Sequence, residues 1–553
     1  MEPELPLPTV ESRQAGIVRS AGVVSGSVLL SRITGLVREV VFARFFGAGL
    51  VYDAFLAAFR IPNLLRDLLA EGALSSAFVT TFSQYSVTKG DREAFRLSNQ
   101  VATILSPVLA LICVAGIVFA PKVIDLMFPG FAEVPGKKEL TVTLTRVMMP
   151  FLFFIALAAK AMGVLNARGV FAIPAAASAF FNIGSLAAGL SCGYWVGPRV
   201  GLSPIEGMAV GTLIGGALQY LVQWPSLRRV GLRYRPELGW ADPGVRQIFR
   251  LMGPAIIGTA AVQINVVVNS NFASQILDST GQVANGPVSW LGYAFRFMQL
   301  PIGMFGVAIA SATLPAIARS AAENQIPEFR STLSRSLGLV FLFSMPSAVG
   351  LAVLAEPIIG VVFQRGEFSP ADTGNTAVAL ACYALGLTGY SAIKVLTPAF
   401  YALNDVRAPL AASLGSIATN YVLNWAFIRL LGWGHAGLAF STSLVATINF
   451  LVLLILLRQK IQRLEGRRLL RSFRRILTAS AAMGLACAAS SYLFRRWLGV
   501  TLWPRAADLL VSIPLGLAVL YAVCRALRVE ELDAAAQAVL DGARIVIKSR
   551  NAH

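Results

Sequence analysis

Charged residues are scarce in this sequence. Only 14% of the 553 residues are Asp, Glu, Lys or Arg, whereas 56% are hydrophobic. A typical soluble domain carries about 25% charged residues, so the composition excludes an ordinary soluble globular protein. The alternation of apolar and polar residues that marks a membrane β-barrel is also missing. The sequence therefore predicts an all-α polytopic membrane protein.

The residues of common catalytic and metal sites are equally rare. The only histidines are His435 and the terminal His553, and the chain contains no HExxH, GxSxG or GxxxxGK[ST] motif. We therefore expect no enzyme, no ATP-driven pump and no metal cofactor. Five cysteines stand singly in apolar segments and are expected to be small core residues; they are Cys113, Cys192, Cys382, Cys487 and Cys524.

Apolar runs long enough to cross a bilayer recur along nearly the whole chain, and residues 1–16 do not resemble a secretory signal. We predict fourteen spans, of which the second is broken at Pro62 and the ninth includes a short additional helix in one reading. They are 21–46, 51–83, 97–120, 140–165, 170–194, 205–224, 247–274, 288–317, 332–363, 374–403, 408–430, 434–457, 472–495 and 506–527.

The net charge of +19 comes from basic residues that concentrate in the loops after even-numbered spans. The positive-inside rule explains this pattern and places both termini in the cytoplasm, with Lys137 and Lys138 as an exception. Because no soluble basic domain is present, nucleic acid is not an expected partner. Residues 530–548 carry apolar side chains at helical spacing and are expected to lie on the cytoplasmic membrane surface.

An internal repeat is visible at an offset of 235–239 residues. Leu165-Asn166 resembles Leu403-Asn404, and Ala58-Phe59-Arg60 resembles Ala294-Phe295-Arg296. An even number of spans per repeat makes the two lobes parallel, with a cavity between them. The predicted divisions are 1–20, a cytoplasmic extension; 21–225, an N-lobe of six spans; 226–246, a basic linker; 247–458, a C-lobe of six spans; 459–528, a basic linker with two further spans; and 529–553, an amphipathic cytoplasmic segment.

The first span has one polar and one apolar face. At 100° per residue, Arg32, Arg38 and Glu39 fall on one side with Ser31 and Thr34, opposite Ile33, Leu36 and Val37. Charged side chains near the middle of a bilayer normally face a bundle interior or a wet cavity. We therefore expect the two arginines to point inward.

Further inward charges are expected at Asp53, Arg60 and Arg66 on the second span and Arg296 on the eighth. Asp53 and Arg60 are seven residues apart and could pair on one helix face. Two readings stay open, namely ion pairs that lock helices together and a binding site. The excess of arginines over acids favours binding of an anion, and the planar guanidinium suits phosphate particularly well.

Prolines and amides mark further candidate positions. Pro62 and Pro301 each follow an arginine-bearing turn and are expected to break their helices, as kinks or as parts of a gate. Asn420 and Asn424 share a helix face and, with Thr442, either coordinate a sodium ion or form hydrogen bonds between helices. Asn265 and Asn269 on the seventh span belong to the same candidate ion site.

Five stretches of the sequence resemble the MurJ/MviN family, the lipid II flippases of the MOP exporter superfamily. They are SRITGLVREVVFARFFGAG from Ser31, DAFLAAFRIPNLLRDLLAEGALSSAFV from Asp53, MGPAIIG from Met252, SWLGYAFRFMQLPIGMFGVAIASATLP from Ser289 and KVLTPAFYALNDVRAP from Lys394.

The resemblance implies two six-helix lobes, two extra helices with a hydrophobic groove, and export of lipid II for peptidoglycan synthesis and cell shape. It matches Arg32, Arg38, Asp53, Arg66 and Arg296 to the essential cavity charges of the family, and Ser289 to a cavity serine. The chain departs from the family at Glu39, Phe295 and Asp67. Asp67 replaces a basic residue after Arg66 and alters the local charge balance.

We therefore predict a non-enzymatic flippase of the bacterial cytoplasmic (inner) membrane that works by alternating access. Its partners are lipid II, membrane lipids and the cell-wall synthesis machinery, and its energy source is a sodium ion or the membrane potential. The alternatives are a cation-coupled multidrug exporter of the same superfamily and a non-transporting scaffold for cell-wall assembly. A candidate gate involves Gly47, Gly49, Pro62 and Pro301, with the loop at 46–52 close to the loop at 285–289.

Overall fold

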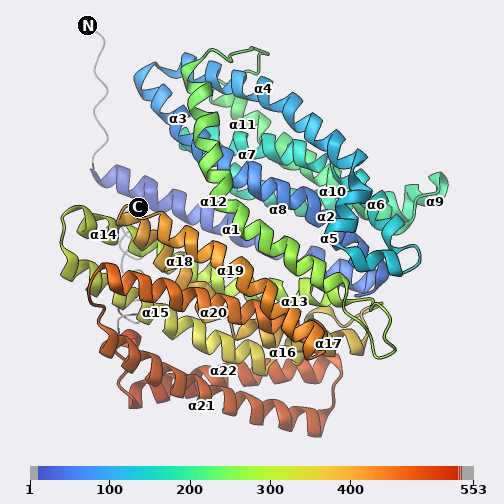
Figure 1. The fold of residues 1–553 in the computed structure, drawn as a ribbon, viewed down its shortest axis with the longest axis vertical. Coiled ribbons are helices and arrows are strands. Elements are labelled where there is room, and N and C mark those ends of the chain that lie inside the picture. Colours follow the sequence, from blue (N-terminus) through green and yellow to red (C-terminus); the bar gives the residue numbers. More distant parts are fainter. Residues whose placement is uncertain (1–9, 534, 536, 538–553) are drawn as a thin grey trace. The chain divides into compact units, whose positions relative to one another are not determined.

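The computed structural model describes residues 10–533, 535 and 537, and within these residues the chain is helical (Figure 1). The described part has no β-strand, and its one isolated bridge joins Leu277 to Val283. Ten of the described helices are long and apolar enough to cross a membrane, or eleven if one bent pair counts as a single span. The prediction of an all-α membrane protein is confirmed, while the count of fourteen spans stays a prediction. Most of the predicted surface segment 530–548 lies outside the described residues.

The chain forms two compact units. The first joins the residues up to Phe42 with Leu50–Gln263, and the second joins Ala43–Gly49 with the residues from Ile264 onward. Elements that begin in the first unit are α1 (Val10–Phe46), α2 (Leu50–Leu65), η1 (Arg66–Leu74), α3 (Ser75–Thr88), α4 (Asp91–Val118), α5 (Ala120–Met127), η2 (Pro129–Glu133), α6 (Lys137–Met148), α7 (Phe151–Ala167), α8 (Ala172–Leu190), η3 (Ser191–Val196), α9 (Gly197–Val200), α10 (Pro204–Leu221), α11 (Trp224–Arg229) and α12 (Pro243–Ser274).

The last turn of α1 and the residues of α12 from Ile264 onward belong to the second unit. The other elements of that unit are α13 (Pro287–Pro301), η4 (Ile302–Val307), α14 (Ala308–Ala322), α15 (Ile326–Val353), α16 (Ala355–Phe363), α17 (Pro370–Ala384), α18 (Leu387–Ala402), α19 (Arg407–Trp425), η5 (Ala426–Leu430), α20 (Gly434–Lys460), α21 (Gly466–Leu498) and α22 (Leu502–Ala526).

The helices repeat with the offset seen in the sequence. Helices α4 and α15 both have 28 residues, and their bounds differ by 235 positions at each end. A short helix follows each of them, α5 in one case and α16 in the other. The run of α6 and α7 corresponds in the same way to α17 and α18, a pair that is bent by 42°. The elements from α4 to α7 in the first unit and from α15 to α18 in the second therefore follow a shared pattern, as expected of a duplicated chain.

Wide π-helical turns occur at matching places in the two units. Segment η1 follows Pro62 by four residues, and η4 begins directly after Pro301. We expected both prolines to break their helices, and this was wrong. The helical path continues through each proline, and a π-helical segment follows each of them within four residues. The second pair of π-helices, η3 and η5, begins 235 residues apart.

Local sequence explains several helix starts. Both α10 and α17 begin with Ser-Pro and a capping box, formed by Ser203 with Glu206 and by Ser369 with Asp372. The core of the second unit centres on α15, whose Leu333 and Leu337 pack with residues of α18 and α21. Helices α21 and α22 pack along each other, and α21 also lies against α15 (Figure 1). All five cysteines are free, and the prediction of small core residues is confirmed for Cys113, Cys487 and Cys524, whereas Cys192 and Cys382 are only partly buried.

Candidate functional site

The polar face of α1 holds a fixed arginine. Arg38 Nη2 lies 3.2 Å from Glu39 Oε1, and the Tyr52 hydroxyl donates to Glu39 Oε2 at 2.8 Å. The Arg38 guanidinium also lies 5.2 Å from the centre of the Phe181 ring. Arg38 and Glu39 are 8% and 2% exposed. The side chains that contact Arg38 therefore fix its position before any substrate binds.

Arg32 has a different environment from Arg38, although the two share a helix. It is exposed, and its side chain forms no hydrogen bond or ion pair with the part of the chain that the structure describes. Ile33, Leu36 and Val37 are also exposed, as the predicted apolar face requires. Arg32 is thus available to a partner from outside the chain.

Asp53 forms an ion pair that the sequence did not predict. Its Oδ2 lies 2.8 Å from Lys137 Nζ, and the two side chains are 0% and 1% exposed. Lys137 also lies 4.3 Å from the centre of the Phe131 ring. Arg60, which could also pair with Asp53 by its spacing, is half-buried on the same helix, α2. Lys137 was an exception to the distribution of basic residues that the positive-inside rule predicts. In the structure it is a fully buried charge at the start of α6.

Asp67 neutralises Arg66 directly. Arg66 donates from Nε and Nη2 to Asp67 Oδ1, at 3.1 and 2.8 Å. The pair is partly exposed, at 25% and 33% of the two side chains. The adjacent carboxylate therefore offsets the charge of Arg66 at the start of η1.

In the second unit, α13 carries the predicted Ser289 and Arg296. Ser289 is fully buried in the first turn of the helix, while Arg296 is exposed. Between them, the Tyr293 hydroxyl donates to the carbonyl oxygen of Gly47 at 3.2 Å. Tyr293 thereby fixes the turn after α1 against α13, within the second unit.

Gly47 and Gly286 lie in the two loops that we expected to meet. Gly47 has a φ of +63°, and a Cβ there would lie 2.5 Å from the Glu367 carbonyl oxygen. Gly286 has a φ of +114°, and its Cβ would lie 2.8 Å from the Ala48 carbonyl oxygen. Gly49, by contrast, has open space around its Cβ position. The close approach of these two loops therefore requires glycine at 286, glycine at 47 is required by the contact with Glu367, and position 49 has no such requirement.

Three of the four asparagines of the candidate ion site form one network. Asn269 Oδ1 accepts hydrogen bonds from Asn420 Nδ2 and Asn424 Nδ2, at 2.9 and 2.8 Å. Asn269 Nδ2 lies 3.4 Å from Thr442 Oγ1, while Asn265 pairs with Ser416 at 3.2 Å. The Oδ1 atoms of Asn420 and Asn424 are buried and have no hydrogen-bond partner in the described chain.

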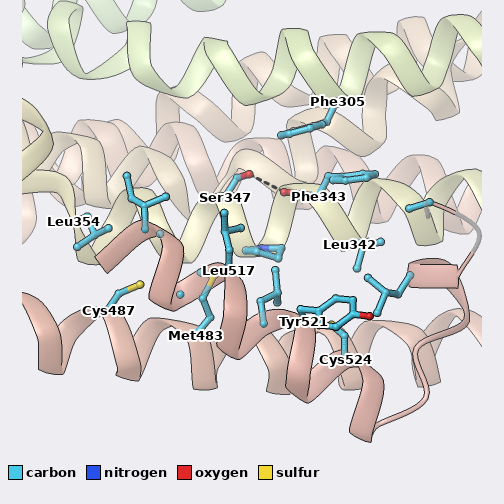
Figure 2. A pocket seen from close by; sticks show the side chains of 17 residues that line it. Phe305, Leu342, Phe343, Ser347, Leu354, Met483, Cys487, Leu517, Tyr521 and Cys524 are labelled. Carbon is cyan, nitrogen blue, oxygen red and sulfur yellow. Dashed lines mark hydrogen bonds between the residues drawn. The ribbon is translucent and has the colours of Figure 1, made fainter. Parts of the chain in front are cut away.

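An apolar cavity of about 370 Å³ lies beside α22 (Figure 2). Phe305 and Phe343 line one side, while Met483 from α21 and Leu517 and Tyr521 from α22 line the other. The hydroxyl of Ser347, which also lines the cavity, donates to its own helix at the Phe343 carbonyl oxygen, 2.7 Å away. The cavity suits a hydrocarbon chain better than a charged group.

The structure separates the predicted charges into two sets. Arg32, Arg38, Asp53, Arg60 and Arg66 belong to the first unit, whereas Ser289, Arg296 and the asparagine network belong to the second. Sequence reasoning missed the contributions of Tyr52, Lys137 and Tyr293. Of these three residues, only Lys137 was noticeable in the sequence, because it lies in a loop where the positive-inside rule predicts few basic residues.

Comparison with known families and structures gives a consistent result. A profile of the family described as "Lipid II flippase MurJ" matches residues 42–507. The "Lipid II flippase MurJ" of Burkholderia cenocepacia is 36% identical over 448 residues, which cover 80% of this chain and 84% of that protein. The "Probable lipid II flippase MurJ" of Rhizobium meliloti is 34% identical over 490 residues and 88% of each chain.

Solved structures extend the comparison to the fold. A structure titled "Lipid II flippase MurJ, inward closed conformation" superposes with a TM-score of 0.73 at 26% identity, covering 91% of this chain and 99% of the other. An inward-facing MATE multidrug transporter of the MOP superfamily gives a TM-score of 0.60 at 15% identity, covering 79% and 94%. The second likeness concerns the fold alone.

Proposed function

The chain belongs to the lipid II flippase MurJ family, and on this premise we propose that it moves lipid II across the cytoplasmic membrane by alternating access. The observation that carries the proposal is the set of arginines on α1, α2 and α13, with exposed Arg32 and Arg296 in different units. Lipid II carries a pyrophosphate, and guanidinium groups bind phosphate oxygens through two parallel hydrogen bonds. In this proposal the arginines bind the pyrophosphate while access alternates between the two leaflets.

Arg38 contributes to this site through its fixed position. Because Glu39 and Tyr52 already orient the guanidinium, little conformational entropy is lost when an anion binds. Arg60 lies on α2 and Arg66 begins the following segment η1, where the carboxylate of Asp67 partly offsets the charge of Arg66. Ser289 precedes Arg296 by seven residues on α13, which places both on one side of that helix. Asp53 serves this site indirectly, because its pair with Lys137 joins α2 to α6.

The lipid tail has a separate place in this proposal. The polyprenyl chain lies along α21 and α22, where the cavity of about 370 Å³ has an apolar lining (Figure 2). In this proposal the apolar tail of lipid II binds to α21 and α22, whereas its charged head binds to the arginines of other helices. Both termini lie in the cytoplasm, as the basic loops indicate.

The turn after α1 is the proposed gate. This turn makes two contacts at Gly47, namely the hydrogen bond from Tyr293 on α13 and the close approach to Glu367. Both contacts form when the exit is closed. Pro62 and Pro301, each followed by π-helical turns, provide the positions where α2 and α13 bend. Opening breaks the hydrogen bond between Tyr293 and Gly47.

The asparagine network is proposed to hold a sodium ion that couples transport to an ion gradient. The buried, unpartnered Oδ1 atoms of Asn420 and Asn424 are neutral oxygen donors, which suit a hard cation of low charge. Thr442 and Asn269 complete the set of oxygens. Ion binding to these residues compensates the free-energy cost of burying the two amide oxygens.

The two alternatives predict different ligands. A multidrug exporter would bind organic cations, for which an arginine-rich site is unsuitable, and a scaffold would bind neither cations nor lipid II. In proteoliposomes with fluorescent lipid II, we expect the wild-type protein to move the label to the other leaflet. Arg296→Gln should abolish transport, whereas Arg199→Gln, on exposed α9, should not. Equal transport by both variants would contradict the proposed role of Arg296.

A further inference from the structure

A second cavity, of about 230 Å³, lies within the first unit and has a buried lysine in its wall. Helix α7 contributes Lys160, helix α4 contributes Asn99 and Ser106, and the chain beyond α10 contributes Trp224 and Tyr234. None of these residues belongs to the proposed transport site. All of them lie in the unit that contains Leu50–Gln263.

Lys160 is 7% exposed, and its ammonium group forms no hydrogen bond or ion pair with any residue that the structure describes. Its nearest aromatic contact is the Phe78 ring, with the centroid 5.9 Å from Nζ. The other buried lysine discussed above, Lys137, has Asp53 at 2.8 Å. A buried ammonium without a counter-ion is costly, so an anion from outside the chain would complete the site at Lys160.

Asn99 supplies a hydrogen-bond acceptor in the same cavity, whereas Lys160 supplies a positively charged donor. Its Nδ2 donates to the Arg233 carbonyl oxygen at 3.0 Å, while its Oδ1 is buried and has no donor in the described chain. A ligand that satisfies both residues carries a negative charge for Lys160 and a hydroxyl group for Asn99. A phosphate ester of a polyol has both features.

The position of the cavity indicates that the ester comes from a lipid. Lys160 precedes the end of α7 at Ala167 by seven residues, which is about 10 Å along a helix. Trp224 and Tyr234 are exposed aromatic residues of the type that lies at membrane interfaces. Arg228 lies over the Trp224 ring at 5.3 Å, and exposed basic residues there attract anionic lipids.

We propose that this cavity binds the headgroup of a phosphatidylglycerol-type phospholipid, with the phosphate on Lys160 and a headgroup hydroxyl on Asn99. The site is separate from the arginines and from the tail cavity of the second unit. Through it, an anionic lipid joins α4, α7 and the chain after α10, and thereby stabilises the first unit.

The test compares lipids of matched chain length on full-length protein in non-ionic detergent. We expect phosphatidylglycerol to raise the melting temperature more than phosphatidylcholine does. Phosphatidylethanol, which has the charge but no headgroup hydroxyl, should bind several-fold more weakly than phosphatidylglycerol. Equal effects of phosphatidylglycerol and phosphatidylcholine would overturn the proposal, and equal binding of the two anionic lipids would overturn the role of Asn99.

Three variants test whether the lipid binds at Lys160. Lys160→Met should weaken phosphatidylglycerol binding at least about tenfold, whereas Lys122→Met, at an exposed lysine of α5, should leave it unchanged. Lys160→Arg should retain the preference for phosphatidylglycerol. Retention of the full preference by Lys160→Met would show that the lipid binds elsewhere, and an equal stabilisation by soluble glycerol phosphate would show that the ligand is not a lipid.

Discussion

Lys137 Nζ and Asp53 Oδ2 lie 2.8 Å apart, and both side chains are almost completely excluded from the surface. Removal of one partner leaves a buried charge uncompensated, which costs about 3–5 kcal/mol. We therefore expect Lys137→Met to lower the melting temperature of the purified protein markedly. The double variant Lys137→Met/Asp53→Leu should recover most of the loss, because it buries no charge.

A melting temperature of Lys137→Met close to that of the wild type would contradict a structural role for this pair. The comparison also separates the two readings of Asp53. If the double variant folds normally but does not transport lipid II, Asp53 has a function beyond its pairing with Lys137.

Arg38→Lys tests the geometry of the anion site. Lysine keeps the charge but loses the planar pair of donors, and a hydrogen bond to a charged group contributes about 1.5–3 kcal/mol. Lipid II binding, measured on purified protein, should therefore weaken at least about tenfold, while membrane levels stay near normal. Arg199→Lys is the matched control, and a loss of Arg38→Lys from the membrane would instead support a structural role.

Gly47→Ala tests the proposed gate. Alanine is disfavoured at a φ of +63°, and its Cβ would lie 2.5 Å from the Glu367 carbonyl oxygen. We expect this variant to fail in growth complementation, since the turn after α1 cannot close against Glu367. Gly49→Ala, which has open space, should complement fully. Normal growth with Gly47→Ala would show that this contact is not needed for transport.

Sodium should stabilise the protein if the asparagine network binds it. A ligand that prefers the native state raises the melting temperature in a concentration-dependent way. We expect a larger rise with sodium chloride than with potassium chloride at equal ionic strength, and no difference between the salts in Asn424→Leu. Identical melting curves of the wild type in both salts would remove the support for this site.

The loop before α19 should make stability depend on pH. Lys460 Nζ lies 2.6 Å from Asp405 Oδ2, and this hydrogen bond, helped by the backbone amide of Ala408, lowers the pKa of Asp405. The folded protein thus binds fewer protons than the unfolded chain, so the contribution is present above about pH 4 and is lost as pH falls further. Asp405→Asn should melt below the wild type at pH 7, and the gap should narrow at about pH 3. A gap independent of pH would contradict the ionic contribution.

Much of the helical organisation could be predicted from one sequence, because helix faces follow from the spacing of nearby residues and repeats follow from similar segments at a constant offset. The apolar face of α1 at Ile33 and Leu36 and the offset of about 235 residues were predicted and are present in the structure. Partners far apart in the chain leave no such trace. Asp53 and Lys137 are 84 residues apart, and no periodicity links them.

Proline gave the clearest wrong prediction. Its missing N–H predicts an interruption at Pro62 and Pro301, but a helix packed among other helices can continue through a proline with the loss of one hydrogen bond. No residue type in the sequence after either proline predicts a π-helix. For the asparagine network, spacing placed Asn420 and Asn424 on one face, whereas their common partner Asn269 was given only by the structure.

The π-helical turns make these points of the chain more tolerant of a change in length than the regular helices beside them. A π-helical turn holds one residue more than an α-helical turn, so deletion of a single residue within Ile302–Val307 would restore a regular α-helix and leave the residues beyond it facing the same way. A deletion in the first turn of α14 has no wide turn to absorb it, and everything beyond would rotate by about 100°. Thr313, which shares a 2.8 Å hydrogen bond with Ser336, and buried Ile317 would then turn away from α15. A one-residue gap within Ile302–Val307 would thus be less damaging than the same gap a few residues later.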